Sequence, residues 1–324
     1  MTTPAISQHS RLSGDEVQQV LALVDAVTEA DGVRPLSEHV MLHLRYGGDE
    51  PGRNLLVRAG DELVGYAFLD TTDAVEGSSA EIAMTPAHRQ NAIARELVEA
   101  LVDQTPDGRL RLWAHGQQAA NSSLARSLAQ SLGFERERVL WQMRRSLFAP
   151  LPAPEFPPDV VLRTFLVGRD ESAWIEVNNR AFAHHPDQGH WTVEDVRRRE
   201  AEPWFDPAGF FLAERAGRLV GFHWTKVHGG SGSGPGTRTG ERTGEQTGEH
   251  GHEPIGEVYV VGVDPDAQGQ RLGPALTLVG LARLRGKGLA QAMLYVDESN
   301  TAAIKVYEEL GFTRWDVDVN YRRG

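Results

Sequence analysis

The chain repeats itself, and this internal repeat limits the folds that it can adopt. Four features recur in the same order in the two halves: Leu63-Val64-Gly65-Tyr66 as Leu219-Val220-Gly221-Phe222, Ala80-Glu81-Ile82 as Gly256-Glu257-Val258, Pro86 as Pro265, and Asn121 with Leu132-Gly133-Phe134 as Asn300 with Leu310-Gly311-Phe312. Ordered matches of this kind indicate a duplicated domain. The proline-rich stretch 149–158 separates the halves, because its prolines cannot continue a helix or a central strand. We therefore expect one domain over 1–150 and another over 151–324.

Each half has the pattern of a mixed α/β domain. Ser13 and Glu16 predict a capping box before a run of valines at helical spacing. The β-branched run 257–263 predicts a strand. Further elements are predicted at 273–285 (helix), 292–296 (strand) and 301–310 (helix, capped by Ser299 or Asn300 and ended by Gly311).

Composition excludes several classes of function. Asp and Glu number 45 against 33 Lys and Arg, and the formal charge of -12 argues against a nucleic-acid partner because an acidic surface repels phosphates. The absence of cysteine excludes disulfides, thiolate metal sites and a cysteine nucleophile. The first eleven residues lack the apolar core of a signal peptide, and no apolar run approaches the ~20 residues that span a bilayer. We expect a cytoplasmic protein without a membrane partner.

Residues 229–254 form a low-complexity insertion. Thr-Gly-Glu recurs three times, with almost no apolar residue to bury, so we expect a flexible segment. His228, His250 and His252 lie in or beside it. Without carboxylates or thiolates at ligand spacing, solvated loop histidines are the default interpretation, and we expect no metal.

The second half contains the pattern with the most chemistry. The strand 257–263 leads through Asp264-Pro265 into Gln268-Gly269-Gln270-Arg271-Leu272-Gly273, which opens a helix. Unpaired N–H groups and the helix dipole suit such a helix start to a pyrophosphate. Asn300 and Tyr307 follow on the last helix. This order resembles the GNAT superfamily of N-acetyltransferases, in which a Gln/Arg-x-x-Gly-x-Gly/Ala loop binds the CoA pyrophosphate, an Asn contacts the pantetheine arm and a Tyr faces the sulfur.

A narrower resemblance covers nearly the whole chain. Its segments are 31–38, 178–189, 204–207, 256–260 and, most specific, Gly221-Phe222-His223-Trp224-Thr225-Lys226-Val227-His228. They resemble the mycothiol synthase (mycothiol acetyltransferase) family of fused GNAT domains. The resemblance implies two tandem domains, each a mixed, mostly antiparallel sheet flanked by helices. It also implies transfer of an acetyl group from acetyl-CoA to the cysteine amine of cysteinyl-glucosaminyl-inositol, giving mycothiol, an actinobacterial thiol, and CoA. We expect a small-molecule acceptor and a monomer.

The resemblance also assigns roles to individual residues. A free α-amine has a pKa of about 7.7, so acetyl transfer at neutral pH benefits from a base. Glu257 is the expected base and acceptor ligand, and Tyr307 the expected acid toward the CoA thiolate. The remaining acceptor ligands are Glu38, Asp187, Lys226 and Tyr295. The implied acetyl-CoA contacts are Val261, Gly262, Val263, Gln268, Gly269, Gln270, Arg271, Leu272, Gly273, Pro274, Asn300, Thr301, Ala302, Ala303, Ile304 and Lys305 in the second half, with Ile82, Ala83, Met84, Gln90, Asn91, Ala92, Ile93, Ala94 and Arg95 in the first. On composition alone, Tyr307 and Tyr295 would be core aromatics, and the charged residues would be solvated.

The loop that binds the pyrophosphate departs from the family pattern. Arg271 stands where the motif has glycine, and its Cβ would crowd the phosphate approach. A shifted register, Gln270-x-x-Gly273-x-Ala275, also fits the motif but lengthens the loop after Pro265, so we prefer the unshifted one.

The first half carries a weaker version of the same site. Ala129 stands four residues before Gly133, where the second half has Tyr307 four residues before Gly311, while Glu81 matches Glu257 in sequence. We therefore expect the first half to lack the acid but not the base, to be catalytically silent, and to complete the acceptor pocket through Glu38.

Two other functions remain open on the sequence. One is a different GNAT activity, on an aminoglycoside or a protein N-terminus. The other is a non-catalytic acyl-CoA-binding regulator.

Overall fold

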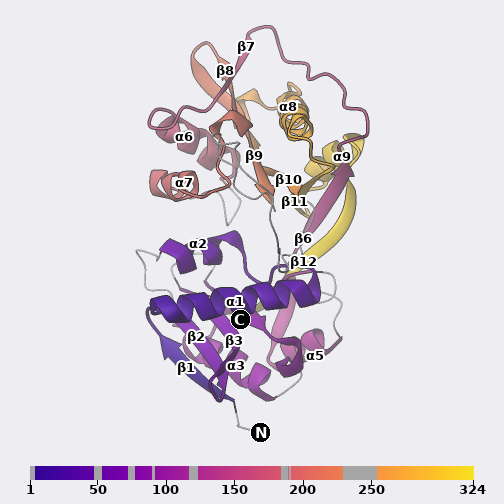
Figure 1. Ribbon diagram of the computed structural model, residues 1–324. Coiled ribbons are helices and arrows are strands. Elements are labelled where there is room, and N and C mark those ends of the chain that lie inside the picture. Colours follow the sequence, from indigo (N-terminus) through magenta and orange to yellow (C-terminus); the bar gives the residue numbers. More distant parts are fainter. Residues whose placement is uncertain are drawn as a thin grey trace, which may run out of the picture. The chain divides into compact units, whose positions relative to one another are not determined.

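The computed structural model describes residues 4–46, 53–71, 77–89, 92–116, 123–183, 189, 191–228 and 254–324 (Figure 1). The first half of the chain forms β1 (Ala5–His9), α1 (Gly14–Asp31), α2 (Glu38–Tyr46), β2 (Arg53–Ala59), β3 (Glu62–Asp70), β4 (Ser78–Met84), η1 (Pro86–His88), α3 (Ala92–Asp103), β5 (Leu110–Ala114), α5 (Ser123–Ser131) and β6 (Phe134–Ser146). The second half forms β7 (Val160–Thr164), α6 (Glu171–Ala181), α7 (Val193–Glu200), η2 (Pro207–Gly209), β8 (Phe210–Arg215), β9 (Arg218–His228), β10 (Ile255–Val263), η3 (Pro265–Ala267), α8 (Leu272–Gly286), β11 (Gln291–Asp297), α9 (Thr301–Glu309) and β12 (Thr313–Arg323).

The chain divides into two compact units. The first comprises Met1–Trp141, Asp297–Ser299 and Asp316–Gly324, and the second comprises Gln142–Val296 and Asn300–Trp315. Strands β6 and β12 therefore contribute residues to both units. The division at 150 and 151 expected from the sequence concerns the duplication and stays a prediction.

The first unit is a mixed sheet with helices on both faces. Its strand order is β1-β2-β3-β4-β5-β12, antiparallel except for the parallel pair β4–β5. Helices α1 and α2 bury valines and leucines against Leu56 and Tyr66 on one face. Helix α3 buries Leu97 and Leu101 against Leu55 and its neighbours in a separate cluster. Alternation of side chains along each strand supplies both cores.

The second unit repeats this arrangement. Its strand order is β6-β11-β10-β9-β8-β7, with β10 and β11 parallel. Along β9, Phe222 and Trp224 pack with Trp174 of α6, whereas His223 between them contacts Leu276 of α8. The sheet therefore separates α6 from α8, as Figure 1 shows.

Local sequence signals placed most elements within two residues of their bounds. Ser13 and Glu16 form the expected capping box. The predicted strand at 257 begins two residues earlier, at Ile255, and the predicted helix at 273 begins one residue earlier, at Leu272. The connector 149–158 contains neither helix nor strand. In the part of the chain that the structure describes, every helix is too short or too polar to cross a bilayer.

Candidate functional site

Glu257 lies where two strands of the second unit separate. Strand β10 pairs with β9 along its length, but within the described residues it pairs with β11 only at Gly256 and Glu257. The β9–β10 register also contains a bulge, because Val258 pairs with Thr225 whereas Val260 pairs with the next residue back, Trp224. Bulges commonly lie beside active sites, where they redirect side chains. Glu257 is thus the last paired residue before β10 leaves β11, and it is only 7% exposed.

Two basic side chains of β9 share the face of the sheet on which Glu257 lies. Lys226 is directly opposite Glu257 in the register. Its Nζ lies 4.3 Å from the ring centre of Trp204 and 5.1 Å from that of Tyr259. The Nε2 of His228 lies 2.6 Å from Oε2 of Glu257. The structure therefore gathers two of the predicted residues, Glu257 and Lys226, with a histidine that was not predicted.

The default interpretation of His228 as a solvated loop residue is wrong. It is the last residue of β9, and its side chain is 28% exposed. The period-two alternation Trp224, Lys226, His228 was a signal that the strand continues this far and that these side chains share a face. The low-complexity insertion that follows concealed it. His250 and His252, like the rest of 229–253, lie outside the described residues.

An arginine that the sequence analysis missed supports the bulge. The Nε of Arg199, on α7, donates to the Tyr259 hydroxyl at 2.6 Å, and its guanidinium lies 3.8 Å from the ring centre of Trp191. Arg199 is buried, and stacking on an aromatic ring keeps its plane fixed. Tyr259 is thereby held in place beside Lys226.

The loop after β10 contains two residues with left-handed backbone before the next helix begins. Gly269 and Arg271 both have positive φ, 77° and 61°. Helix α8 begins at Leu272, and its first turn contains no acidic residue. The N–H groups of Leu272 and Gly273 lack intrahelical acceptors, as at any helix start, so the site fits a phosphate. Pro274 has no N–H to offer but is tolerated in the first turn.

The other predicted CoA residues of the second half occupy the ends of β10 and α9. Val261, Gly262 and Val263 end β10, and a Cβ at Gly262 would lie 2.7 Å from the Phe222 ring. Asn300 caps α9 by accepting from the N–H of Ala303 at 3.1 Å. Thr301, Ala302 and Lys305 are exposed on α9, whereas Ile304 is buried.

The two predicted tyrosines differ in setting. Tyr307, on α9, packs edge-on against Phe312 with ring centres 5.9 Å apart, and burial raises its pKa to about 12. Tyr295, on β11, is 41% exposed, and its hydroxyl accepts from Nε2 of Gln142 at 2.8 Å. The alternative that Tyr295 is an ordinary core aromatic is therefore wrong.

The strand registers show that Glu81 and Glu257 do not occupy equivalent positions in the two units. In each unit, the residue that follows the strand donates its backbone N–H to the same position of the neighbouring strand: Thr85 to the Val64 carbonyl after β4, and Asp264 to the Val220 carbonyl after β10. Thr85 and Asp264 are therefore equivalent and give a common starting point for comparing the two registers. Counting from there, Glu81 pairs with Phe68 and corresponds to Val260, which pairs with Trp224. The counterpart of Glu257 is Ser79, which pairs with Asp70 as Glu257 pairs with Lys226. The first unit therefore has a serine where the second has the proposed base.

The sheet of the first unit also lacks the bulge. Strands β3 and β4 pair without a shift from Gly65–Met84 to Asp70–Ser79. The sequence matched the two glutamates by their neighbouring residues, although Glu81 lies about five positions before Pro86 and Glu257 about eight before Pro265, and the bulge in β10 accounts for one of these extra positions.

Glu81 belongs to a buried ionic cluster in the first unit. It accepts from the N–H of Ser37 at 2.5 Å, and its Oε2 lies 3.8 Å from Nε2 of His115. The Nδ1 of His115 lies 3.1 Å from Oδ2 of Asp318. Burial alone would lower the pKa of His115, but the hydrogen bonds and charges of Asp318 and Glu81 raise it to about 10. Glu81 thus faces an imidazolium.

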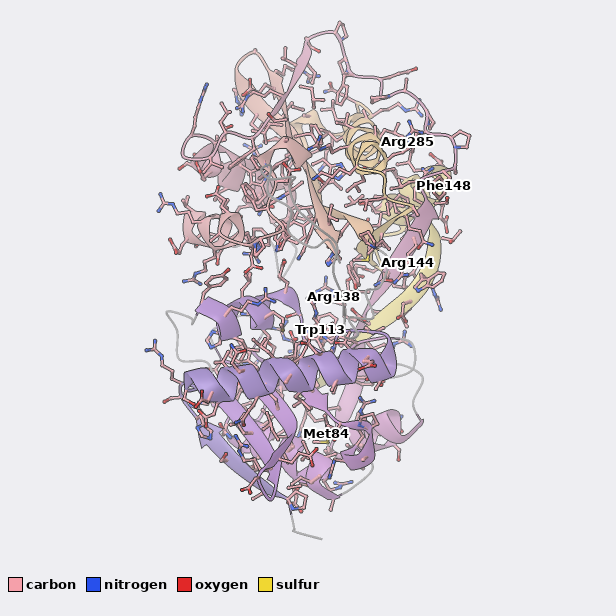
Figure 2. All side chains as sticks on the ribbon, in the orientation of Figure 1. Met84, Trp113, Arg138, Arg144, Phe148 and Arg285 are labelled. Carbon is pink, nitrogen blue, oxygen red and sulfur yellow. The ribbon has the colours of Figure 1, made fainter. Side chains whose placement is uncertain are left out.

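The remaining predicted residues of the first half lie on α2, β4 and α3. Glu38 begins α2 and is partly buried. On β4, Ile82 is partly buried while Ala83 and Met84 are buried, and Met84 is labelled in Figure 2. On α3, Ala92 is exposed, Ile93 is buried, Ala94 is partly buried, and Arg95 donates to Ser131. Asp187, Gln90 and Asn91 lie outside the described residues.

Similarity to known proteins agrees with this geometry. Residues 22–134 and 173–312 both match the acetyltransferase (GNAT) family. A mycothiol acetyltransferase of Streptosporangium roseum is 54% identical over 98% of this chain and 99% of its own. One of Acidothermus cellulolyticus is 56% identical over 98% of this chain and 94% of its own. The chain belongs to the mycothiol acetyltransferase family.

Solved structures show the same tandem architecture. A GCN5-related N-acetyltransferase from Sphaerobacter thermophilus is 25% identical, with a TM-score of 0.66 over 98% of this chain and 95% of that one. A tandem GNAT protein from the clavulanic acid biosynthesis pathway is 17% identical and shares the fold, with a TM-score of 0.71 over 99% and 98%.

Arg271, the residue that departs from the GNAT motif, has a left-handed backbone conformation. Its left-handed backbone is the conformation that favours glycine, the residue of the GNAT motif at this position in the unshifted register. The shifted register would instead place the motif glycine at Gly273, inside α8. The structure thus favours the unshifted register. The Arg271 side chain is exposed, so it does not fill the loop.

Proposed function

We propose that this chain transfers the acetyl group of acetyl-CoA to the cysteine amine of cysteinyl-glucosaminyl-inositol, giving mycothiol and CoA. Relatives named mycothiol acetyltransferase, more than half identical over nearly the whole chain, support the substrate assignment. The observation that carries the chemistry is the buried carboxylate of Glu257 at the separation of β10 and β11.

Glu257 is the proposed general base. The acceptor amine is largely protonated near its pKa of about 7.7, and only the neutral amine can attack a thioester carbonyl. A carboxylate at the strand separation accepts one ammonium proton, and its charge also attracts the cationic acceptor. The C–N bond forms as the neutral amine attacks, and the nitrogen of the tetrahedral intermediate then loses its second proton to water. Collapse of the intermediate breaks the C–S bond and releases the CoA thiolate, which takes up a proton from solvent.

Tyr307 is the proposed partner of the departing thiolate. With a pKa of about 12, its phenol keeps its proton throughout the neutral range. A free thiol has a pKa of about 8.5, so complete transfer from Tyr307 to a thiolate would be uphill by roughly 3.5 pKa units, or about 5 kcal/mol. We infer that Tyr307 acts chiefly by donating a hydrogen bond to the developing thiolate.

Acetyl-CoA supplies the activated acetyl group, and the chain offers groups to hold it. The N–H groups of Leu272 and Gly273 are the proposed ligands of the pyrophosphate, and Asn300, at the start of α9, is the proposed ligand of the pantetheine arm. The other residues of both halves that the GNAT motif implies are proposed as further contacts. Glu38, Asp187, Lys226 and Tyr295 are the proposed ligands of the acceptor.

The first unit is proposed to be catalytically silent. It has Ser79 at the counterpart of Glu257, Ala129 at the sequence counterpart of Tyr307, and no bulge between β3 and β4. Its expected contribution is Glu38 for acceptor binding.

Release of free CoA from acetyl-CoA tests the function. With desacetylmycothiol as the acceptor, we expect turnover, and Glu257→Gln should lower it by ~10²–10⁴ without unfolding the protein. Near-normal turnover of this variant between pH 6.5 and 9, roughly the range in which the amine titrates, would remove Glu257 from the mechanism. Faster turnover with an aminoglycoside or a peptide N-terminus in the same assay would show that one of these, and not desacetylmycothiol, is the acceptor. Acetyl-CoA binding with no CoA release for any acceptor would indicate a regulator.

A further inference from the structure

The imidazole of His228 engages one oxygen of the Glu257 carboxylate. Its Nε2 lies 2.6 Å from Oε2 of Glu257. An ionised carboxylate can only accept hydrogen bonds, so the proton of this contact belongs to His228. The Glu257 side chain is 10% exposed, which leaves little water to replace the histidine as a donor. The contact occupies Oε2 and leaves Oε1 as the oxygen that can meet the acceptor amine.

We propose that His228 is a positioning residue that fixes the Glu257 carboxylate with Oε1 toward the acceptor amine. The proposal rests on the proposed role of Glu257 as the base. A proton acceptor must lie within hydrogen-bond reach of the proton that it removes, and a displacement of about 1 Å can cost about a hundredfold in rate. A carboxylate whose two oxygens exchange freely would spend only part of its time in a productive orientation.

The charged groups around this pair come from three elements. Glu257 is on β10, while Lys226 and His228 are on β9 and share its face of the sheet. The Nζ of Lys226 lies over the rings of Trp204 and Tyr259. Arg199 of α7 binds the hydroxyl of Tyr259. In this set, His228 forms a hydrogen bond with the Glu257 carboxylate.

The duplicated strand pair shows that the fold does not require this arrangement. In the first unit, Asp70 and Ser79 occupy the counterparts of Lys226 and Glu257, and β3 still pairs with β4. Strand pairing therefore forms with a serine in place of the glutamate and an aspartate in place of the lysine. The contact between His228 and Glu257 belongs to the half that carries the proposed chemistry.

A double-mutant cycle in the full-length protein tests the proposal, with kcat and both KM values measured for acetyl-CoA and desacetylmycothiol. His228→Ala should lower kcat about tenfold to a hundredfold, as expected for loss of a hydrogen bond to a charged group, and leave the KM for acetyl-CoA unchanged. His228→Gln places an amide N–H donor near the same oxygen and should restore most of kcat. Adding His228→Ala to Glu257→Gln should cause no further loss, because no carboxylate remains to be positioned.

A matched control and the pH profile separate positioning from a structural role. His9→Ala removes a ring with the same 28% exposure that also lies beside a glutamate, 3.5 Å from Glu16 in the first unit, and should leave kcat unchanged. The pH profile of kcat in His228→Gln should follow that of the unmodified protein. Positioning requires a hydrogen-bond donor at residue 228 but no change in the protonation of that side chain.

Three results would overturn the proposal while the function stands. They are a normal kcat in His228→Ala, an additive loss in the double variant, and no rescue by a folded His228→Gln. Normal turnover of Glu257→Gln would instead remove the proposed base, and the role of His228 with it.

Discussion

His223 makes the stability of the second unit depend on pH, and the effect can be calculated from its surroundings. The residue is fully buried, and its Nδ1–H donates to the carbonyl of Leu276 at 2.7 Å. Its Nε2 has no hydrogen-bond partner among the described residues. Burial lowers the pKa of His223 to about 4, against the smaller opposing effect of the Leu276 carbonyl. The folded protein therefore holds this ring neutral where the unfolded chain would protonate it.

The sign and size of the effect follow from the two pKa values. An unfolded histidine titrates near pH 6.5, so below that pH the unfolded state binds a proton that the folded state refuses. The contribution of the neutral His223 ring to the free energy of unfolding is therefore fully present above about pH 6.5 and is lost progressively as the pH falls toward 4. Between pH 7.5 and pH 5, a shift from 6.5 to 4 corresponds to a loss of about 2 kcal/mol in the free energy of unfolding.

Urea unfolding of the protein and of His223→Gln at pH 7.5 and pH 5 measures this loss. Four of the seven tryptophans, Trp174, Trp191, Trp204 and Trp224, lie in the core beside β9, so fluorescence reports mainly on this unit. The glutamine can still donate a hydrogen bond, but it does not titrate. The variant should be less stable at pH 7.5, yet should lose about 2 kcal/mol less on acidification. Because all other groups titrate in both proteins, equal losses would refute a buried neutral His223.

Two further substitutions test other contacts. Tyr307→Phe should lower kcat about tenfold to a hundredfold with little change in folding, because it removes one hydrogen bond to a developing charge; an unchanged kcat in the CoA-release assay would contradict the role. Gly280→Ala should destabilise the protein by about 1–3 kcal/mol in urea unfolding, although alanine normally favours a helix, because its Cβ would lie 2.0 Å from the His223 ring. A more stable alanine variant would show that the ring can move away.

The sequence predicted what depends on neighbouring residues. The capping box of Ser13 and Glu16, the strand ending at Val263 and the cap at Asn300 are local, and the structure contains all three. The family resemblance likewise predicted the tandem fold. Glu257 and Lys226 were both expected to be site residues, and the structure pairs them across β10 and β9.

Register and long-range contacts could not be predicted in the same way. Pairing across the sheet and the bulge in β10 decide which residues of the two units correspond, and a match of letters contains neither, so it equated Glu257 with Glu81 instead of Ser79. The carboxylate of Asp318 binds the N–H of Gly116, 202 positions away, and no local pattern announces such a contact. His228 was missed because a polar insertion follows it directly.

The order in which the chain is synthesised adds a consequence to the division of β12 between the units. Domains generally fold as units during translation, the N-terminal one first. Here the strand that pairs with β5, and the Asp318 that faces His115, follow the second unit in the chain and are synthesised after it. The first unit must therefore wait, with an open sheet edge and an incomplete ionic cluster, until the second has been made. A gene cut at the proline-rich connector would deprive it permanently of that strand, so the ancestral duplication can no longer be reversed by simple separation of the halves.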